Sequence, residues 1–204
     1  MRLLMSRFAR RREVFFLEEP VFSDVESLQI RPCARTGVQV VTPMLPVSGV
    51  EERRAVLDLL LARSGCAIAW YTAPEARAFS GHVSWLATVY DCAGRPSAAG
   101  RAFEDRLIQV ADLVFAGGLR LYEDRRDLHP NIHCFPQGIE QGIPLRATSD
   151  ALSERDDRMW DATHQHMAAL LTMTERNAAF PPPSLSRFGS VPAFPDAREV
   201  VPAG

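Results

Sequence analysis

The chain has 204 residues, of which 47% are hydrophobic and 24% are charged, a composition typical of a soluble globular protein. No apolar run approaches the roughly 18 residues that a membrane-spanning helix needs, which excludes an integral membrane protein. The formal net charge of −2 argues against nucleic-acid binding, and all 23 basic residues are arginine, which excludes Schiff-base and P-loop lysine chemistry.

The N-terminal segment predicts the end of a short amphipathic helix, because Leu4 and Phe8 are four residues apart. The three arginines at 10–12 follow where positive charge suits the helix dipole, and contact with anionic lipid is the alternative role. The apolar run at residues 3–5 is too short for a signal peptide, so we expect a cytoplasmic protein with free thiols at its four scattered cysteines.

Short apolar runs predict strands at residues 14–17, 39–43, 67–71, 85–90, 113–116 and 132–135. The first of these runs, Val14-Phe15-Phe16-Leu17, is unbroken, as expected of a strand buried on both faces of a parallel sheet. Helical spacing of apolar residues predicts helices at 48–65, 103–111, 121–126 and 153–175. The expected caps are a capping box of Ser48 with Glu51, a stop at Gly65, and Ser153 at the start of the last helix.

Strands alternating with helices in units of about 25 residues predict an α/β domain with a Rossmann-like, mainly parallel sheet over residues 1–148. A long helix over 149–177 follows, with the apolar stripe Trp160, Met167, Leu170 and Leu171. Residues 178–204 contain six of the fifteen prolines. We expect this segment to be a disordered tail or an extended arm laid over another surface.

Two strand ends are the candidate binding positions. Ligands of open α/β sheets bind outside the carboxyl ends of the strands, and Tyr90 and Asp91 lie at such an end. The alternative for Asp91 is that it caps the following turn. Gly117 and Gly118 follow another predicted strand, where glycine allows positive φ and a close approach of the backbone to an anion. A plain strand-to-helix turn explains the glycines equally well.

No cofactor or metal is expected. His129 and His133 are four residues apart, but Pro130 between them opposes the helix that such a metal site requires. His164 and His166 would point away from each other on a helix. The sequence also contains no nucleophile elbow, P-loop or dinucleotide-binding fingerprint.

Taken in order, the stretches MSRFARRREVFFLEEPVF, WYTAPEARAF, LATVYDC and EDRLIQVADLVFAGGLRLYEDRRDLHPNIHCFPQGIE carry a more specific signal than any single motif. Over roughly residues 5–140 the chain resembles the N-terminal half of bacterial GT-B glycosyltransferases of the family-4-like group, which includes teichuronic-acid-type enzymes and proteins associated with UDP-galactopyranose mutase. The resemblance implies a Rossmann-like domain in which Tyr90, Asp91, Gly117 and Gly118 line an interdomain cleft.

The departures from this family are also specific. Its usual first strand and Arg-Pro-Gln-His loop are absent, Ala93-Gly94-Arg95 stands where Met-Asp-Glu is usual, and Gln137-Gly138 replaces a serine-containing pair. The second, donor-binding Rossmann domain is missing. Residues 150–174 instead resemble the closing helix of such enzymes, which packs back on the N-terminal domain.

The resemblance implies a glycosyltransferase-family protein of cell-surface polysaccharide synthesis, with a nucleotide-sugar donor and a glycan acceptor. Because the donor domain is absent, we expect the chain to be truncated and weakly active or inactive alone. Two alternatives remain: a non-catalytic domain that binds a glycan or a complete glycosyltransferase, and a small nucleotide-binding protein that uses the Gly117-Gly118 turn.

Overall fold

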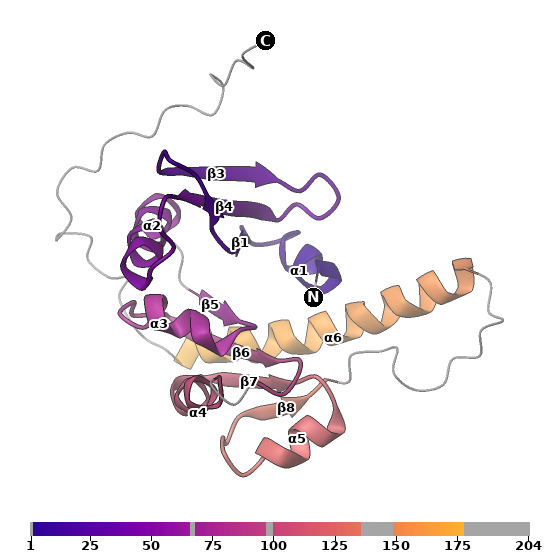
Figure 1. Ribbon diagram of the computed structural model, residues 1–204. Coiled ribbons are helices and arrows are strands. Elements are labelled where there is room, and N and C mark those ends of the chain that lie inside the picture. The colour runs from indigo at the N-terminus through magenta and orange to yellow at the C-terminus, as the bar shows by residue number, and fades with distance from the viewer. Residues whose placement is uncertain (1, 66–67, 97–99, 136–148, 178–204) are drawn as a thin grey trace.

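The computed structural model describes residues 2–65, 68–96, 100–135 and 149–177, which form two β-sheets and their covering helices (Figure 1). The predicted Pro-rich segment at 178–204 lies outside the described residues, as do the segment at 136–148 and Cys66. The chain is therefore a mixed α/β protein in which parallel strands are flanked by helices, as the sequence predicts.

The larger part of the core lies around a sheet of four parallel strands in the order β5-β6-β7-β8. These strands are Ile68–Tyr71, Ala87–Cys92, Leu113–Ala116 and Ile132–Cys134. Every residue of β6 and β7 is buried, which is why their sequences are continuous apolar runs interrupted only by Thr88 and Asp91. These two strands hold the ends at which a ligand would be expected.

Helices cover both faces of this sheet. One face carries α1 and α6, and the other carries η1, α3, α4 and α5 (Figure 1). The bounds are α1 Arg2–Phe8, η1 Pro74–Ala76, α3 Arg77–Ser80, α4 Arg101–Val110, α5 Leu119–Arg125 and α6 Ser149–Asn177. This layering produces two apolar clusters, one on each side of the sheet.

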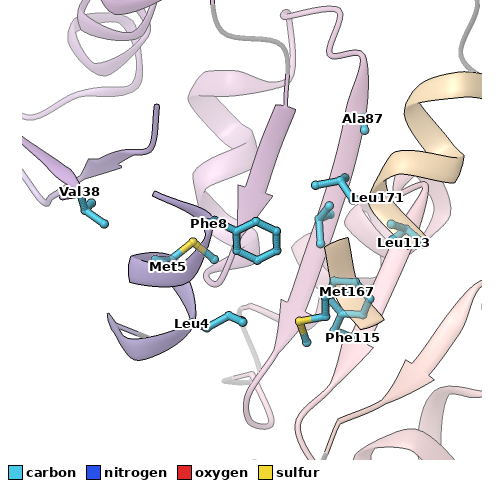
Figure 2. Packing of buried hydrophobic residues seen from close by; sticks show 10 residues of the cluster. Leu4, Met5, Phe8, Val38, Ala87, Leu113, Phe115, Met167 and Leu171 are labelled. Carbon is cyan, nitrogen blue, oxygen red and sulfur yellow. The ribbon is translucent and has the colours of Figure 1, made fainter. Parts of the chain in front are cut away.

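The N-terminal helix and the long C-terminal helix share one apolar cluster with the sheet. Leu4, Met5 and Phe8 of α1 meet Met167 and Leu171 of α6 above β6 and β7 (Figure 2). Two arginines strengthen this contact: Arg7 Nε donates to Asp161 at 2.6 Å, and Arg12 binds both oxygens of Glu175 at 2.6 and 2.7 Å. The two helices thus cover the sheet as a pair.

The second sheet was not predicted as a separate unit. Its central strand β4 (Gln39–Leu45) pairs in parallel with β1 (Phe15–Leu17) and β2 (Val21–Phe22), and antiparallel with β3 (Ser27–Pro32) on its other edge. The predicted strand at 39–43 continues beyond Pro43. The prediction that residues 14–17 are buried on both faces is wrong, since Phe16 is 43% exposed on a strand with a single partner.

The strands β1 and β2 are two parts of one interrupted strand. Between Leu17 and Val21 the chain advances four residues while β4 advances three, from Val41 to Met44. The extra residue makes a bulge, which re-aims Glu18 and Glu19. The Thr42 hydroxyl donates to Glu18 Oε2 at 2.7 Å, and Arg53 donates to Glu19 Oε2 at 2.6 Å.

The helix α2 (Val50–Ser64) connects the two sheets and ends as predicted, because Gly65 adopts a left-handed conformation with φ 60°. The predicted capping box at its start is wrong. Gly49 is the N-cap, and the Ser48 hydroxyl instead accepts hydrogen bonds from Arg53. Ser153 is not a cap either, since α6 begins at Ser149. Among the described helices, none is long and apolar enough to cross a lipid bilayer.

Candidate functional site

The candidate residues come together at the carboxyl edge of the parallel sheet. Cys92 of β6 is paired in register with Ala116 of β7, and the Gly117 N–H donates to the Cys92 carbonyl oxygen at 2.9 Å. The pair Tyr90-Asp91 and the pair Gly117-Gly118 are therefore neighbours, although 26 positions separate Asp91 from Gly117 in the chain. The alignment of parallel strands produces this juxtaposition.

The Asp91 side chain lies on the face of the sheet that α1 and α6 cover, because alternate strand residues share a face with Val89. It is 4% exposed, and its Oδ2 accepts a hydrogen bond from Trp70 Nε1 at 3.3 Å. Burial raises the pKa of this carboxyl, and the hydrogen bond from Trp70 lowers it only in part. Asp91 thus bonds to an indole on the neighbouring strand, which is not the geometry of a turn cap.

Tyr90 points to the opposite face. Its hydroxyl donates to Glu104 Oε1 of α4 at 2.8 Å, and burial raises the pKa of the phenol. Glu104 also accepts two hydrogen bonds from Arg125 of α5, at 3.1 and 3.2 Å, and the Cys92 thiol contacts the same carboxylate at 3.5 Å. Tyr90 and Asp91 therefore serve different sides of the sheet.

Sequence reasoning missed Glu104 and Arg125, whose side chains are only 6% and 8% exposed. A signal for Glu104 was present, since it lies three and four residues before Leu107 and Ile108 on the buried stripe of the α4 helix. A carboxylate on such a stripe needs a buried partner. Nothing local in the sequence identifies that partner as Arg125.

The backbone at Gly118 does not require the conformational freedom of glycine. The φ of Gly118 is 176°, an extended conformation, and among the described glycines only Gly37 and Gly65 adopt the left-handed region. A Cβ atom built on Gly118 would meet nothing within 4 Å, so the space beside it is open. The helix that follows, α5, has only seven residues and cannot supply a strong anion site.

The predicted histidine candidates have structural partners. His129 Nε2 lies 2.9 Å from the Ala111 carbonyl oxygen, and its Nδ1 accepts from the Asn131 N–H. His133 packs edge-on against His166 of α6, with ring centroids 6.2 Å apart, and burial lowers its pKa. In the described ranges, no three His, Cys, Asp or Glu side chains are arranged to hold a metal ion.

The site therefore offers a buried, hydrogen-bonded carboxyl and an open glycine turn at one edge of a parallel sheet. Such an edge can hold a polar ligand through the backbone of its glycine turn, in the manner of Rossmann-like α/β proteins. Comparison with known proteins adds no assignment: no family model, curated protein or solved structure matches this chain.

Proposed function

We propose that this chain is a glycosyltransferase-family protein of the GT-B type, and that its described residues form the acceptor side of the substrate cleft. Support comes from the motif order over residues 5–140 and from the consecutive parallel order of β5 to β8. The reaction would transfer a sugar from a nucleotide-sugar donor to a glycan acceptor of cell-surface polysaccharide.

The observation that carries the proposal is the meeting of two separated motifs. The Tyr90-Asp91 strand end and the Gly117-Gly118 turn lie side by side at the carboxyl edge, joined by the hydrogen bond from Gly117 to Cys92. This edge is where open α/β sheets bind ligands. The 4 Å of open space around a Cβ position at Gly118 leaves room for an acceptor hydroxyl beside the backbone.

The chemistry of such a transfer needs a base for the acceptor hydroxyl and positive groups for the departing diphosphate. After β8, the described residues contain only the helix α6 and no second parallel sheet. Positioning both substrates supplies about 7–11 kcal/mol of barrier lowering, and that contribution requires a donor-binding partner. We therefore propose weak or no transfer by the chain alone.

The test records amide chemical shifts of the chain during titration with a panel of hexose oligosaccharides. The expected result is a set of changes confined to residues 90–92 and 117–118, and a matched panel of UDP- and GDP-sugars should undergo no turnover with the purified chain. Rapid sugar transfer by the chain alone contradicts the acceptor-side assignment, and an unresponsive carboxyl edge contradicts carbohydrate binding there.

A non-catalytic binding domain is the second candidate, and the burial of Asp91 favours it. A carboxyl that is 4% exposed and bonded to Trp70 is not positioned to take a proton from an acceptor. Such a domain would bind a glycan or a complete glycosyltransferase. The two candidates differ in a mixing experiment, because only an acceptor lobe restores transfer when a separate donor-binding domain is added.

We also propose that the chain acts in the cytoplasm, at the inner face of the membrane. Arg10 and Arg11 follow α1 and are exposed, and neither forms an ion pair within the described ranges. Arginines of this kind are attracted to anionic lipid headgroups. Sedimentation with vesicles that contain phosphatidylglycerol, compared with neutral vesicles, measures this contact.

A further inference from the structure

A hollow between α3 and α4 has no role in the proposed function. It measures about 340 Å³. The helices α3 and α4 that line it lie on the side of the parallel sheet away from α1 and α6 (Figure 1). Its lining comes from α3, the residue that follows it, and the outward face of α4: Arg77, Ala78, Gly81, Phe103, Arg106, Gln109 and Val110. None of these residues belongs to the carboxyl edge described above.

The hollow is positively charged. Arg77 and Arg106 are its only ionisable lining residues, and neither guanidinium has a carboxylate partner among the residues described. By contrast, Arg7, Arg53 and Arg125 each bind an acid. Two unpaired guanidinium groups in one hollow favour an anion that accepts hydrogen bonds from both, and phosphate has the matching geometry.

The hollow also has an apolar wall. Phe103 lies on α4 four residues before the buried Leu107, but it is only partly buried and lies outside both apolar clusters. It lines the hollow together with Val110, which is 45% exposed. A half-covered aromatic ring beside cationic groups offers a stacking surface to a flat ring on the same ligand.

Gly81 fixes the shape of one side. A Cβ atom at this position would lie 2.9 Å from the Arg77 carbonyl oxygen and 3.7 Å from Arg77 Nη1. The Arg77 side chain thus lies against the Gly81 backbone, and glycine leaves it the room to do so. Gln109 adds an amide that both donates and accepts hydrogen bonds.

From these four features we propose that the hollow binds a phosphate monoester that carries a flat ring, such as a nucleoside monophosphate. The phosphate is held between Arg77 and Arg106, the ring stacks on Phe103, and Gln109 contacts the polar edge of the ring. This binding site is independent of the proposed transferase cleft, since the two share no residue.

Calorimetric titration of the full chain with uridine 5′-monophosphate, adenosine 5′-monophosphate, inorganic phosphate and uridine tests the proposal. Both nucleotides should bind more tightly than phosphate, and uridine should not bind. The double variant R77A/R106A should lose about tenfold or more in affinity, because hydrogen bonds to charged groups contribute most. The matched double variant R101A/R120A removes two exposed arginines outside the hollow and should bind like the parent chain.

The variant F103A separates the contribution of ring stacking from that of phosphate binding. It should weaken nucleotide binding severalfold while leaving phosphate binding unchanged. Nucleotide binding that survives in R77A/R106A overturns the assignment, as does equal loss in R101A/R120A. Absence of binding to the parent chain overturns it as well. Thermal unfolding of each variant ensures that a lost affinity is measured on folded protein.

Discussion

The β5–β8 sheet lies between two layers of helices, whereas the β1–β4 sheet leaves large apolar side chains in contact with solvent. Phe115 of β7 is 1% exposed, but Phe22 of β2 is 74% exposed. The difference indicates that the β5–β8 sheet contributes more to the free energy of unfolding than the β1–β4 sheet does. A strand covered on both faces contributes apolar burial at every residue, and a strand with one covered face contributes it at alternate residues.

The largest effect is expected when the same truncation is made at one phenylalanine of each sheet. Phe115→Ala should destabilise the chain by about 3–5 kcal/mol, because the ring packs against Trp70 and Phe135 in a closed core. Phe22→Ala should change the free energy of unfolding by less than about 0.5 kcal/mol. Urea unfolding measures both, and equal losses would show that the β1–β4 sheet is also a rigid part of the core.

The second test compares ion pairs. Arg125→Met leaves the buried Glu104 carboxylate without its cation and should cost about 3–5 kcal/mol. Glu19→Gln removes the ion pair with Arg53 beside the other sheet, and since Glu19 is 82% exposed the cost should be below about 1 kcal/mol. The double variant E104Q/R125M should recover part of the loss. If it is no more stable than Arg125→Met, the stranded charge is not the cause.

The third test uses the effect of Asp91 ionisation on the pH dependence of stability. Burial raises the pKa of this carboxyl in the folded chain, so the folded state releases its proton less readily than the unfolded state. Stability is therefore lost as pH rises above about 4, the ordinary pKa of aspartate. Asp91→Asn keeps an oxygen for Trp70 and should raise the melting temperature at neutral pH.

The gain in melting temperature from Asp91→Asn should shrink as the pH falls toward the ordinary pKa of aspartate. The matched variant Asp105→Asn, at an exposed position of α4, should show no such pH-dependent difference. A melting temperature of Asp91→Asn below the parent value at every pH would mean that the ionised carboxylate stabilises the fold.

The smallest effect is expected at His164, which packs edge-on against Phe8 with ring centroids 4.6 Å apart. Burial and the charges of Arg7, Arg10 and Arg11 lower its pKa, while Asp161 opposes them. The folded chain thus resists protonation, and stability from this contact is lost as pH falls below about 6.5.

His164→Gln should make α6 less sensitive to acid, measured as hydrogen exchange of α6 amides on either side of that pH. His82→Gln is the control, because His82 binds Asp58 at 2.7 Å in an exposed pair. Equal acid sensitivity in the parent chain and His164→Gln would remove His164 as the cause.

Sequence reasoning predicted the β5–β8 sheet well because its signals are local. The predicted strand at 113–116 has the same bounds as β7. The predicted helix at 103–111 differs from α4 by one or two residues at each end. The strand β3 was missed, since the predictions used continuous apolar runs and β3 has only Leu28 and Ile30 before it ends at Pro32. The Ser48 cap failed because Arg53, which is held by Glu19 from the segment between β1 and β2, donates to the serine hydroxyl.

The candidate site was predictable only in position. The pattern located Asp91 and Gly117 at strand ends, and strand register then aligned them. The partners that decide their chemistry, Trp70 for Asp91 and Glu104 for Tyr90, lie on other elements. Such partners depend on which strands and helices become neighbours, which no local pattern contains.

The pairing of α1 with α6 has a consequence for how the chain is made. Phe8 and Phe115 reach their final environment only after Met167 and Leu171 have been synthesised, because all four belong to one cluster. On the ribosome, the nascent chain thus exposes an uncovered apolar sheet face until α6 emerges. The chain is therefore most prone to aggregation during the part of its synthesis that precedes α6.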